Sequence, residues 1–215
     1  MKFKSVIFDL DGTLLDTVED IADSVNRVLS AKGLPVYDMD FYRHKVGYGT
    51  ASLVKSVLPS DRRSERDISD FIRMLRRDYE KNWAVKTTPF NGITQALKNI
   101  SAGGVTMAVL SNKIHEITAL SVDRFFSGIR FHVVRGQLDG VALKPDPAAA
   151  LEIAGMMCCD PEETVFVGDT AVDIQTAVAA GMFPLGVSWG FRPEELEDAG
   201  AARIITHPAQ MTQLF

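Results

Sequence analysis

The sequence predicts an α/β fold in which a parallel sheet is interrupted, after its first strand, by an all-helical insertion. Two patterns along the 215-residue chain support this prediction. A β-branched and aromatic run over residues 5–8 precedes a long stretch, residues 17–86, whose apolar residues recur at helical spacing. From residue 89 onward, short apolar runs typical of buried strands alternate with helical segments. Such alternation favours parallel strands joined by right-handed crossovers.

The inserted block begins just after Asp16. We expect Thr17 to be the N-cap of its first helix, with Asp20 at the capping-box position, and Gly33 to end that helix. Two further helices are expected over residues 50–58 and 64–83. The second of these carries an apolar stripe made of Ile68, Phe71, Ile72, Leu75 and Tyr79. The chain therefore divides into a core, residues 1–16 and 87–215, and a helical cap domain, residues 17–86.

The second half of the chain supplies the rest of the core. Strands are predicted over residues 105–110, 131–134, 164–167, 184–187 and 203–205, and helices over residues 92–102, 114–125, 147–156, 173–180 and 192–199. Asp139-Gly140 is typical of a hairpin turn. The expected core is Rossmann-like, a sheet in which ligands bind beyond the carboxyl ends of the strands. The inserted helices would stand over that edge.

Composition limits the possible classes of function. Hydrophobic residues make up 46% and charged residues 24%, and the formal net charge of −5 argues against a sequence-independent nucleic-acid surface. No apolar run reaches the length of a membrane span, and acidic residues interrupt the first apolar run, so we expect no signal peptide and a cytoplasmic location. The adjacent Cys158 and Cys159 are expected to be reduced thiols.

The most informative motif is Asp9-Leu10-Asp11-Gly12-Thr13, directly after the first strand. Because side chains alternate along a strand, Asp9 and Asp11 should project to one face, and Gly12 permits a sharp exit. Two close carboxylates repel each other unless a cation, a proton or a basic partner is present. The same letters occur in calcium loops, but those need further oxygen ligands and a glutamate downstream. An enzyme can use such a pair as a nucleophile beside a general acid/base.

Polar residues also follow the other predicted strands. Ser111 and Asn112 follow the second strand, and Asp169 follows the fourth, with Asp173 one helical turn further on. Lys144 lies in a proline-rich loop that enters a helix. Taken singly, the serine, asparagine and aspartates could be helix caps, and the lysine could be a solvated surface residue. Their joint occurrence at the strand ends favours one site instead.

The pattern resembles the haloacid dehalogenase-like superfamily, whose members are mostly phosphatases. Its motifs match the Asp9–Thr13 segment, Ser111, Lys144, and Gly168-Asp169-Thr170 with Asp173, and the resemblance covers essentially the whole chain, including the inserted cap. A non-catalytic relative that binds phosphorylated ligands is disfavoured because Asp9 and Lys144 are both retained. A purely structural module would leave the clustered carboxylates without purpose.

The resemblance implies a role for each motif residue. Asp9 would be the nucleophile that forms an aspartyl-phosphate, and Asp11 the general acid/base. Ser111 and Lys144 would hold the phosphoryl oxygens. The other expected substrate contacts in the core are Gly12, Thr13 and Asn112. The expected cofactor is Mg²⁺, and its ligands would be the Asp9 carboxylate, the Asp11 carbonyl and Asp169, with Asp173 acting through water or by orienting its neighbours.

Within the superfamily, the chain looks like the phosphoglycolate phosphatases. The resemblance lies in residues 11–17 and in the cap loop Val46-Gly47-Tyr48-Gly49. The candidates for substrate contact in the cap are Arg43, Gly47, Tyr48 and Lys55. Pyrophosphatases, nucleotidases, sugar phosphatases and β-phosphoglucomutase-like phosphotransferases share this type of cap and stay as alternatives.

Dehalogenation is disfavoured, because the dehalogenases of the family lack an aspartate at the position of Asp11. The expected partner is a small phosphorylated metabolite, with no nucleic acid and no membrane. The expected oligomeric state is a monomer or a homodimer.

Overall fold

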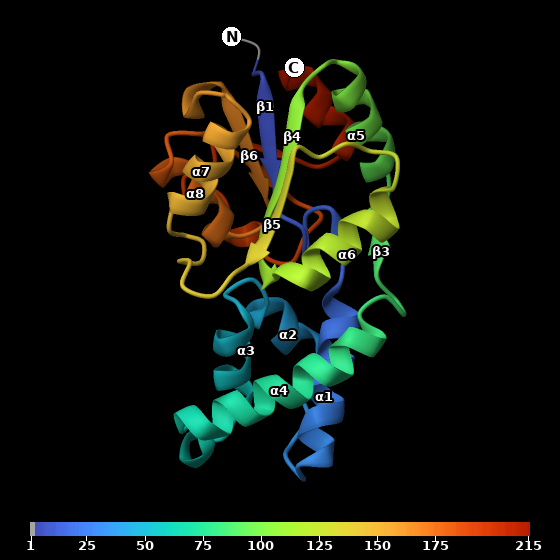
Figure 1. Ribbon diagram of the computed structural model, residues 1–215, viewed down its shortest axis with the longest axis vertical. Coiled ribbons are helices and arrows are strands. Elements are labelled where there is room, and N and C mark those ends of the chain that lie inside the picture. Colours follow the sequence, from blue (N-terminus) through green and yellow to red (C-terminus); the bar gives the residue numbers. More distant parts are fainter. Residues whose placement is uncertain (1–2) are drawn as a thin grey trace.

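The computed structural model describes residues 3–215 and has two parts, a sheet-containing core and a helical unit placed at one end of it (Figure 1). The core contains a parallel sheet of six strands in the order β5-β4-β1-β6-β7-β8. The bounds of these strands are Ser5–Phe8 (β1), Thr106–Ile114 (β4), Val133–Gln137 (β5), Thr164–Gly168 (β6), Phe183–Val187 (β7) and Arg203–Ile205 (β8). The predicted α/β class with a Rossmann-like parallel sheet is confirmed.

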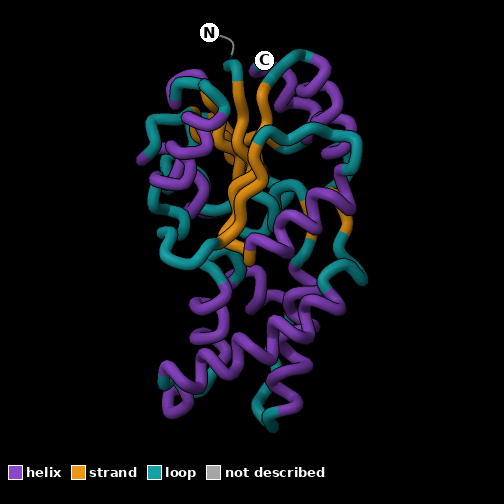
Figure 2. Tube along the Cα trace, in the orientation of Figure 1, coloured by secondary structure: helices purple, strands orange, loops and turns teal. Residues whose placement is uncertain are grey.

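Helices cover both faces of this sheet, as Figure 2 shows. Alternation along β1 sends Val6 and Phe8 into an apolar layer with α5 (Ile93–Ala102) and α6 (His115–Phe126). Ile7 points the other way, into a layer with α7 (Ala148–Met156) and α8 (Ala171–Ala179). Because β1 is buried on both faces and paired on both edges, the residues that follow it are fixed firmly in place.

The helical unit consists of four helices: α1 (Val18–Ala31), α2 (Met39–Lys45), α3 (Thr50–Val57) and α4 (Glu65–Asn82). They surround a third apolar cluster, which includes the fully buried Tyr42 and Phe71 and to which the core contributes Phe191. In Figure 1 this unit lies beyond the carboxyl ends of β1 and β4. A helical insertion over the ligand-binding edge of the sheet is therefore present, while the domain boundaries at residues 16/17 and 86/87 stay a prediction.

The two chain segments that connect the core and the helical unit lie side by side. Leu15–Asp16 (β2) and Thr88–Pro89 (β3) pair antiparallel, a feature that the sequence analysis did not predict. The predicted capping box at the start of α1 is wrong, since Thr17 makes no side-chain cap bond. Asp20 instead accepts hydrogen bonds from the Thr87 amide (2.8 Å), the Thr87 hydroxyl (2.7 Å) and the Lys86 amide (3.0 Å). Asp20 thus fastens the outgoing segment to the returning one.

Other differences from the predictions lie outside the sheet. The helix expected over residues 192–199 is only a 3₁₀ turn, Pro193–Glu195, because the chain turns where Leu196 is buried against Gly186. Asp139-Gly140 does form a turn but no hairpin, since β5 pairs in parallel with β4 and leads on to α7. The helix α2 was not predicted. Cys158 and Cys159 are free thiols, as expected.

Three further short 3₁₀ segments complete the description of the chain. Their bounds are Ser60–Arg62, Pro161–Glu163 and Pro208–Leu214. Within residues 3–215, no helix combines the length and the apolar character that crossing a membrane requires.

Candidate active site

Asp9 lies at the carboxyl end of β1 in a buried ion-pair network. Its side chain is 8% exposed, and its Oδ1 lies 2.8 Å from Nζ of Lys144, which also lies 2.7 Å from Oδ1 of Asp173. Burial raises the pKa of Asp9 to about 7, although the Lys144 charge opposes the shift. Burial also disfavours the Lys144 ammonium, but Asp173 and Asp9 outweigh this effect and hold the pKa of Lys144 above its usual value. Lys144 is therefore a fixed positive charge between two carboxylates.

A third carboxylate completes a buried acidic cluster. Oxygen atoms of Asp9, Asp169 and Asp173 all lie within 4.8 Å of one another. Burial and then the charges of Asp173 and Asp9 raise the pKa of Asp169 well above its usual value. One ammonium cannot balance three carboxylates, and clustered carboxylate oxygens are the ligands that hard divalent cations prefer. The donor set therefore fits a divalent metal ion.

Asp169 and Asp173 are oriented by neighbouring backbone and hydroxyl groups. Asp169 accepts hydrogen bonds from the Thr13 hydroxyl (3.0 Å) and the Phe191 amide (2.7 Å). Asp173 accepts from the Thr170 amide (3.1 Å) and hydroxyl (2.9 Å), which forms a capping box at the start of α8. These bonds fix the carboxylates before any ligand binds.

Gly12 permits the close approach of the loop after β1 to Asp169. Its φ of +88° is unfavourable for other residues, and a Cβ atom there would lie 2.2 Å from Oδ2 of Asp169. Gly12 and Thr13 were predicted to contact substrate, and the structure gives them a part in orienting Asp169. Their contact with substrate stays a prediction.

Asp11 faces the same cavity as Asp9 but has a different basic partner. Its Oδ1 accepts a hydrogen bond of 2.9 Å from Nζ of Lys113, which also donates to the Tyr79 hydroxyl at 2.7 Å. Burial disfavours the Lys113 ammonium, but the charge of Asp11 and the hydrogen bonds to Asp11 and Tyr79 outweigh this effect and raise the pKa of Lys113 above its usual value. Burial raises the pKa of Tyr79 to about 12, so Tyr79 keeps its proton. Asp11 lies outside the carboxylate cluster that fits a metal ion, and a role for its carbonyl stays a prediction.

Ser111 and Asn112 lie within β4, beside Asp9, and neither caps α6. The side-chain nitrogen of Asn112 donates to the backbone carbonyls of Gly47 (2.9 Å) and Lys144 (3.0 Å), and its side-chain oxygen accepts from the backbone amide of Lys144 (2.9 Å). Asn112 therefore joins β4 to the Lys144 loop and to the helical unit. Both residues line the cavity, where Ser111 offers a hydroxyl.

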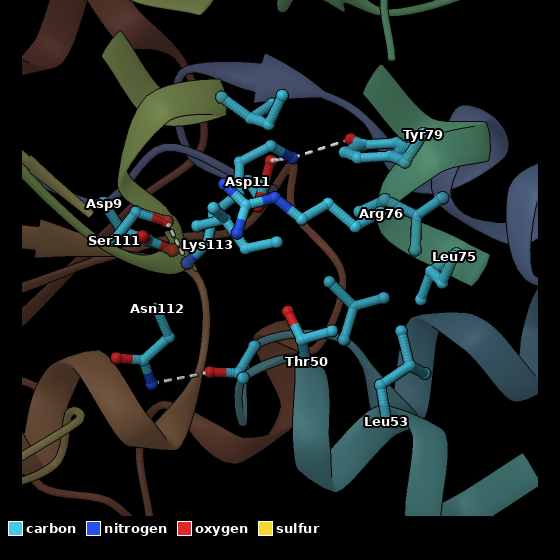
Figure 3. A pocket seen from close by; sticks show the side chains of 16 residues that line it. Asp9, Asp11, Thr50, Leu53, Leu75, Arg76, Tyr79, Ser111, Asn112 and Lys113 are labelled. Atoms are coloured by element: carbon cyan, nitrogen blue, oxygen red, sulfur yellow. Dashed lines mark hydrogen bonds and ion pairs between the residues drawn. The ribbon is translucent and has the colours of Figure 1, made fainter. Parts of the chain in front are cut away.

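A cavity of about 80 Å³ lies between the core and the helical unit (Figure 3). Its core side is formed by Asp9, Asp11, Ser111, Asn112, Lys113, Ile114 and Ile117. Its other side is formed by Ile21, Val46, Gly47, Gly49, Thr50, Leu53, Leu75, Arg76 and Tyr79. Most of the second group is apolar, so the polar groups are concentrated on the core side.

Of the four cap residues predicted to contact substrate, the structure brings only Gly47 to the lining of this cavity. Tyr48 packs against the guanidinium of Arg192, and Lys55 is exposed on α3. Arg43 contributes its carbonyl, which accepts a 2.7 Å hydrogen bond from Arg192. Arg43, Tyr48 and Lys55 therefore do not line this cavity, and their contact with substrate stays a prediction.

Four polar residues of the cavity were not predicted from the sequence: Thr50, Arg76, Tyr79 and Lys113. Lys113 directly follows Ser111-Asn112, and this adjacency was the available signal. Tyr79 was assigned to the apolar stripe of α4, where its ring indeed packs, but its hydroxyl reaches Lys113. Arg76 lies on the same helix, 49% exposed, and contacts Glu116 of α6 at 3.6 Å.

Comparison with known proteins agrees with this architecture. Residues 6–187 match the haloacid dehalogenase-like hydrolases. The chain is 29% identical over 205 residues to a phosphoglycolate phosphatase of Mesorhizobium japonicum, which covers 94% of this chain and 90% of that protein. It is 31% identical over 208 residues to a phosphoglycolate phosphatase of Pseudomonas putida, which covers 93% of this chain and 75% of that protein.

A solved structure gives the same result. A candidate phosphoglycolate phosphatase from Lactobacillus delbrueckii subsp. bulgaricus matches with a TM-score of 0.91 at 27% identity, covering 99% of this chain and 98% of the other. The chain therefore belongs to the haloacid dehalogenase-like hydrolase family. Within that family it is a phosphoric monoester hydrolase.

Proposed function

We propose that the chain is a Mg²⁺-dependent, cytoplasmic phosphatase that hydrolyses phosphoglycolate through a phosphorylated Asp9. The observation that carries the proposal is the pair of carboxylates, Asp9 and Asp11, that line one small cavity but have separate basic partners. Such a pair can divide the work, with one group attacking phosphorus and the other transferring protons.

In the first half-reaction, an oxygen of Asp9 forms a bond to phosphorus while the bond from phosphorus to the ester oxygen breaks. Asp11 gives a proton to that departing oxygen, so glycolate leaves as the alcohol. Lys144 and Ser111 are suited to hold the phosphoryl oxygens, because the ammonium of Lys144 already lies 2.8 Å from Asp9. Asp9 attacks as the carboxylate, which Lys144 stabilises.

In the second half-reaction, Asp11 takes a proton from a water molecule that attacks the phosphorylated Asp9. This releases inorganic phosphate and restores both carboxyl groups to their starting forms. Asp9, Asp169 and Asp173 would hold Mg²⁺, which supplies positive charge to offset the phosphoryl oxygens. The low-dielectric surroundings of this buried site strengthen these electrostatic interactions.

Three observations favour phosphoglycolate as the substrate. The two curated relatives described above, at 29% and 31% identity, are phosphoglycolate phosphatases. The cavity of about 80 Å³ favours a small substrate. Arg76, whose side chain is 49% exposed, adds positive charge to the lining of the cavity, which suits a substrate with a second anionic group.

The test is phosphate release with Mg²⁺ across phosphoglycolate, sugar phosphates, nucleotides and pyrophosphate, with Asp9→Asn as the control variant. We expect phosphoglycolate to give the highest kcat/KM and Asp9→Asn to be inactive with every compound. Preference for pyrophosphate, a nucleotide or a sugar phosphate would replace the proposed substrate. Full activity of Asp9→Asn would overturn the mechanism.

A further inference from the structure

Lys113 connects the two parts of the molecule at the floor of the cavity. It belongs to β4, and its side chain is only 6% exposed. Its ammonium contacts Asp11 of the core and Tyr79 of α4, and it lies 4.9 Å from the centroid of the Tyr79 ring. A single cation therefore joins the proposed acid/base carboxylate to the helical unit.

The other polar contacts between the helical unit and the core do not reach a carboxylate of the site, within the part of the chain that the structure describes. Asn112 contacts the carbonyl of Gly47, Arg192 contacts two carbonyls at the end of α2, and Arg76 contacts Glu116 at the rim. The connection from Tyr79 through Lys113 to Asp11 is different, because displacement of α4 would remove one of the two partners that orient the ammonium.

We propose that Lys113 and Tyr79 are positioning residues, which hold the Asp11 carboxylate in place for proton transfer only while the helical unit is docked. This inference rests on the proposed function, in which Asp11 gives its proton to the departing ester oxygen. Lys113 binds Oδ1 of Asp11, which leaves Oδ2 for the reacting oxygen. When α4 moves away, Lys113 loses the Tyr79 hydroxyl and Asp11 loses a fixed partner.

The proposed nucleophile and the proposed acid/base differ in whether they depend on the helical unit. Asp9 is held by Lys144 and the core alone, so the nucleophile is prepared whether or not the helical unit is docked. The acid/base residue is completed by a residue of α4. The protein would therefore transfer protons efficiently only when the substrate is enclosed and bulk water is excluded.

The test compares two substrates that differ in their need for a proton. An alkyl phosphate (the best alkyl substrate of the panel) has a poor leaving group, whereas p-nitrophenyl phosphate releases a stabilised phenolate that needs little protonation. Single-turnover measurements with enzyme in excess report the first half-reaction, and steady-state measurements give kcat and KM. The variants are Tyr79→Phe, Lys113→Met and the double variant. Tyr37→Phe is the control, because the Tyr37 hydroxyl bonds to the Val57 carbonyl inside the helical unit.

We expect Tyr79→Phe to lower the single-turnover rate with the alkyl phosphate by ~10-fold and Lys113→Met by ~100-fold, the latter at the lower end of what general acid catalysis supplies. The rate with p-nitrophenyl phosphate should fall much less for both variants, and KM should change little. The double variant should match Lys113→Met, because Tyr79 acts through Lys113. Tyr37→Phe should behave like the unmodified chain with both substrates.

Equal losses with the two substrates, or additive losses in the double variant, would overturn the inference. An increase in KM alone would also overturn it and would make Lys113 a substrate-binding residue. Thermal unfolding checks each variant, and Tyr79→Phe, which removes one hydroxyl, keeps the test valid if Lys113→Met folds poorly. Activity in Asp9→Asn would mean that the proposed function fails. An inactive Asp9→Asn together with an unimpaired Tyr79→Phe would reject the positioning role alone.

Discussion

Asp9 and Asp11 are two residues apart, yet their surroundings are built in different ways. The charged neighbours of Asp9 belong to the core: Lys144 from the loop before α7, Asp169 directly after β6, and Asp173 from α8. Asp11 is bound by Lys113 of the core, and Lys113 is bound in turn by Tyr79 of the helical unit. The proposed nucleophile is therefore held within the core, whereas the proposed acid/base is connected through Lys113 to the helical unit.

This difference separates the charged cluster at the sheet edge from the helical unit that lies over it. The three carboxylates of the acidic cluster are all buried. Hydrogen bonds from Thr13, Thr170 and the Phe191 amide orient Asp169 and Asp173, and Lys144 holds Asp9. The helical unit adds mostly apolar surface, together with the polar side chains of Thr50, Arg76 and Tyr79. Changes of sequence in the helical unit can therefore alter the substrate specificity without disturbing the groups proposed to carry out phosphoryl transfer.

The largest expected effect is that of Asp9→Asn. We expect kcat to fall by roughly 10⁵–10⁶-fold, as in enzymes that lose a nucleophile. The free energy of unfolding of the metal-free protein should not fall, because the change neutralises one of three crowded carboxylates. Phosphate release and urea unfolding measure the two quantities. A large loss of stability would mean that Asp9 is mainly a structural partner of Lys144.

Lys144→Met should impair both activity and stability. Its removal leaves Asp9 and Asp173 buried without their shared cation, which should cost about 3–5 kcal/mol of unfolding free energy. We expect kcat to fall by about 10³-fold, since a charge near the phosphoryl oxygens is lost. Lys98→Met, a change of an exposed lysine on α5, is the control and should have little effect. Unchanged stability of Lys144→Met would contradict the paired geometry.

The pH dependence of metal binding should follow Asp9. Its pKa is raised from 3.8 to about 7, so in this range the metal-free folded chain holds a proton that the unfolded chain has released. The stability of the metal-free protein should therefore fall as pH rises from about 4 to about 7. Below pH 7, Mg²⁺ must displace this proton in order to bind. The affinity for Mg²⁺ should therefore fall by up to about tenfold for each unit that the pH is lowered below 7, and the proton on Asp9 should no longer affect it above pH 7.

Calorimetric titration of Mg²⁺ at pH 6 and pH 8 would measure this effect. Binding should be weaker at pH 6, and proton release, detected in buffers of different ionisation enthalpy, should accompany it. Equal affinity for Mg²⁺ at pH 6 and pH 8 would mean that Asp9 is not part of the metal site.

The smallest effect on catalysis is expected at the connection between the two parts. Asp20→Ala removes the acceptor for the Thr87 and Lys86 groups and should lower the free energy of unfolding by about 1–3 kcal/mol. Single-turnover rates should change little, because Asp20 does not line the cavity. Asp23→Ala, which loses only an exposed ion pair with Lys86, is the matched control and should be close to neutral. A larger effect on rate than on stability would make Asp20 part of the catalytic machinery.

Local sequence patterns were sufficient to predict most of the strands and helices of the core. The final strand was predicted over residues 203–205 and is observed as Arg203–Ile205, because the β-branched pair Ile204-Ile205 favours a strand locally. The positions of Asp9, Ser111, Asp169 and Asp173 at the sheet edge followed from the rule that ligand sites lie beyond strand ends.

Contacts between distant segments could not be predicted in this way. Asp20 has the spacing of a capping-box residue, but its partners are 66 and 67 residues away along the chain. Tyr79 fits an apolar stripe, and nothing in its local sequence shows that its hydroxyl meets Lys113. Arg192 lies in a segment with a helical pattern, yet its buried side chain binds the end of α2. In each case the side chain forms a hydrogen bond with a residue that is distant in the sequence, and no local pattern indicates that partner.

The most direct test of this account is acid-quench mass spectrometry of the protein mixed with p-nitrophenyl phosphate and Mg²⁺. With Asp11→Asn, we expect a phosphoryl group to accumulate on Asp9, because this substrate needs no proton for the first step but the second step lacks its base. Asp9→Asn should show no label. Absence of any label in Asp11→Asn while p-nitrophenol is still released, or a label on another residue, would contradict the division of roles between the two carboxylates.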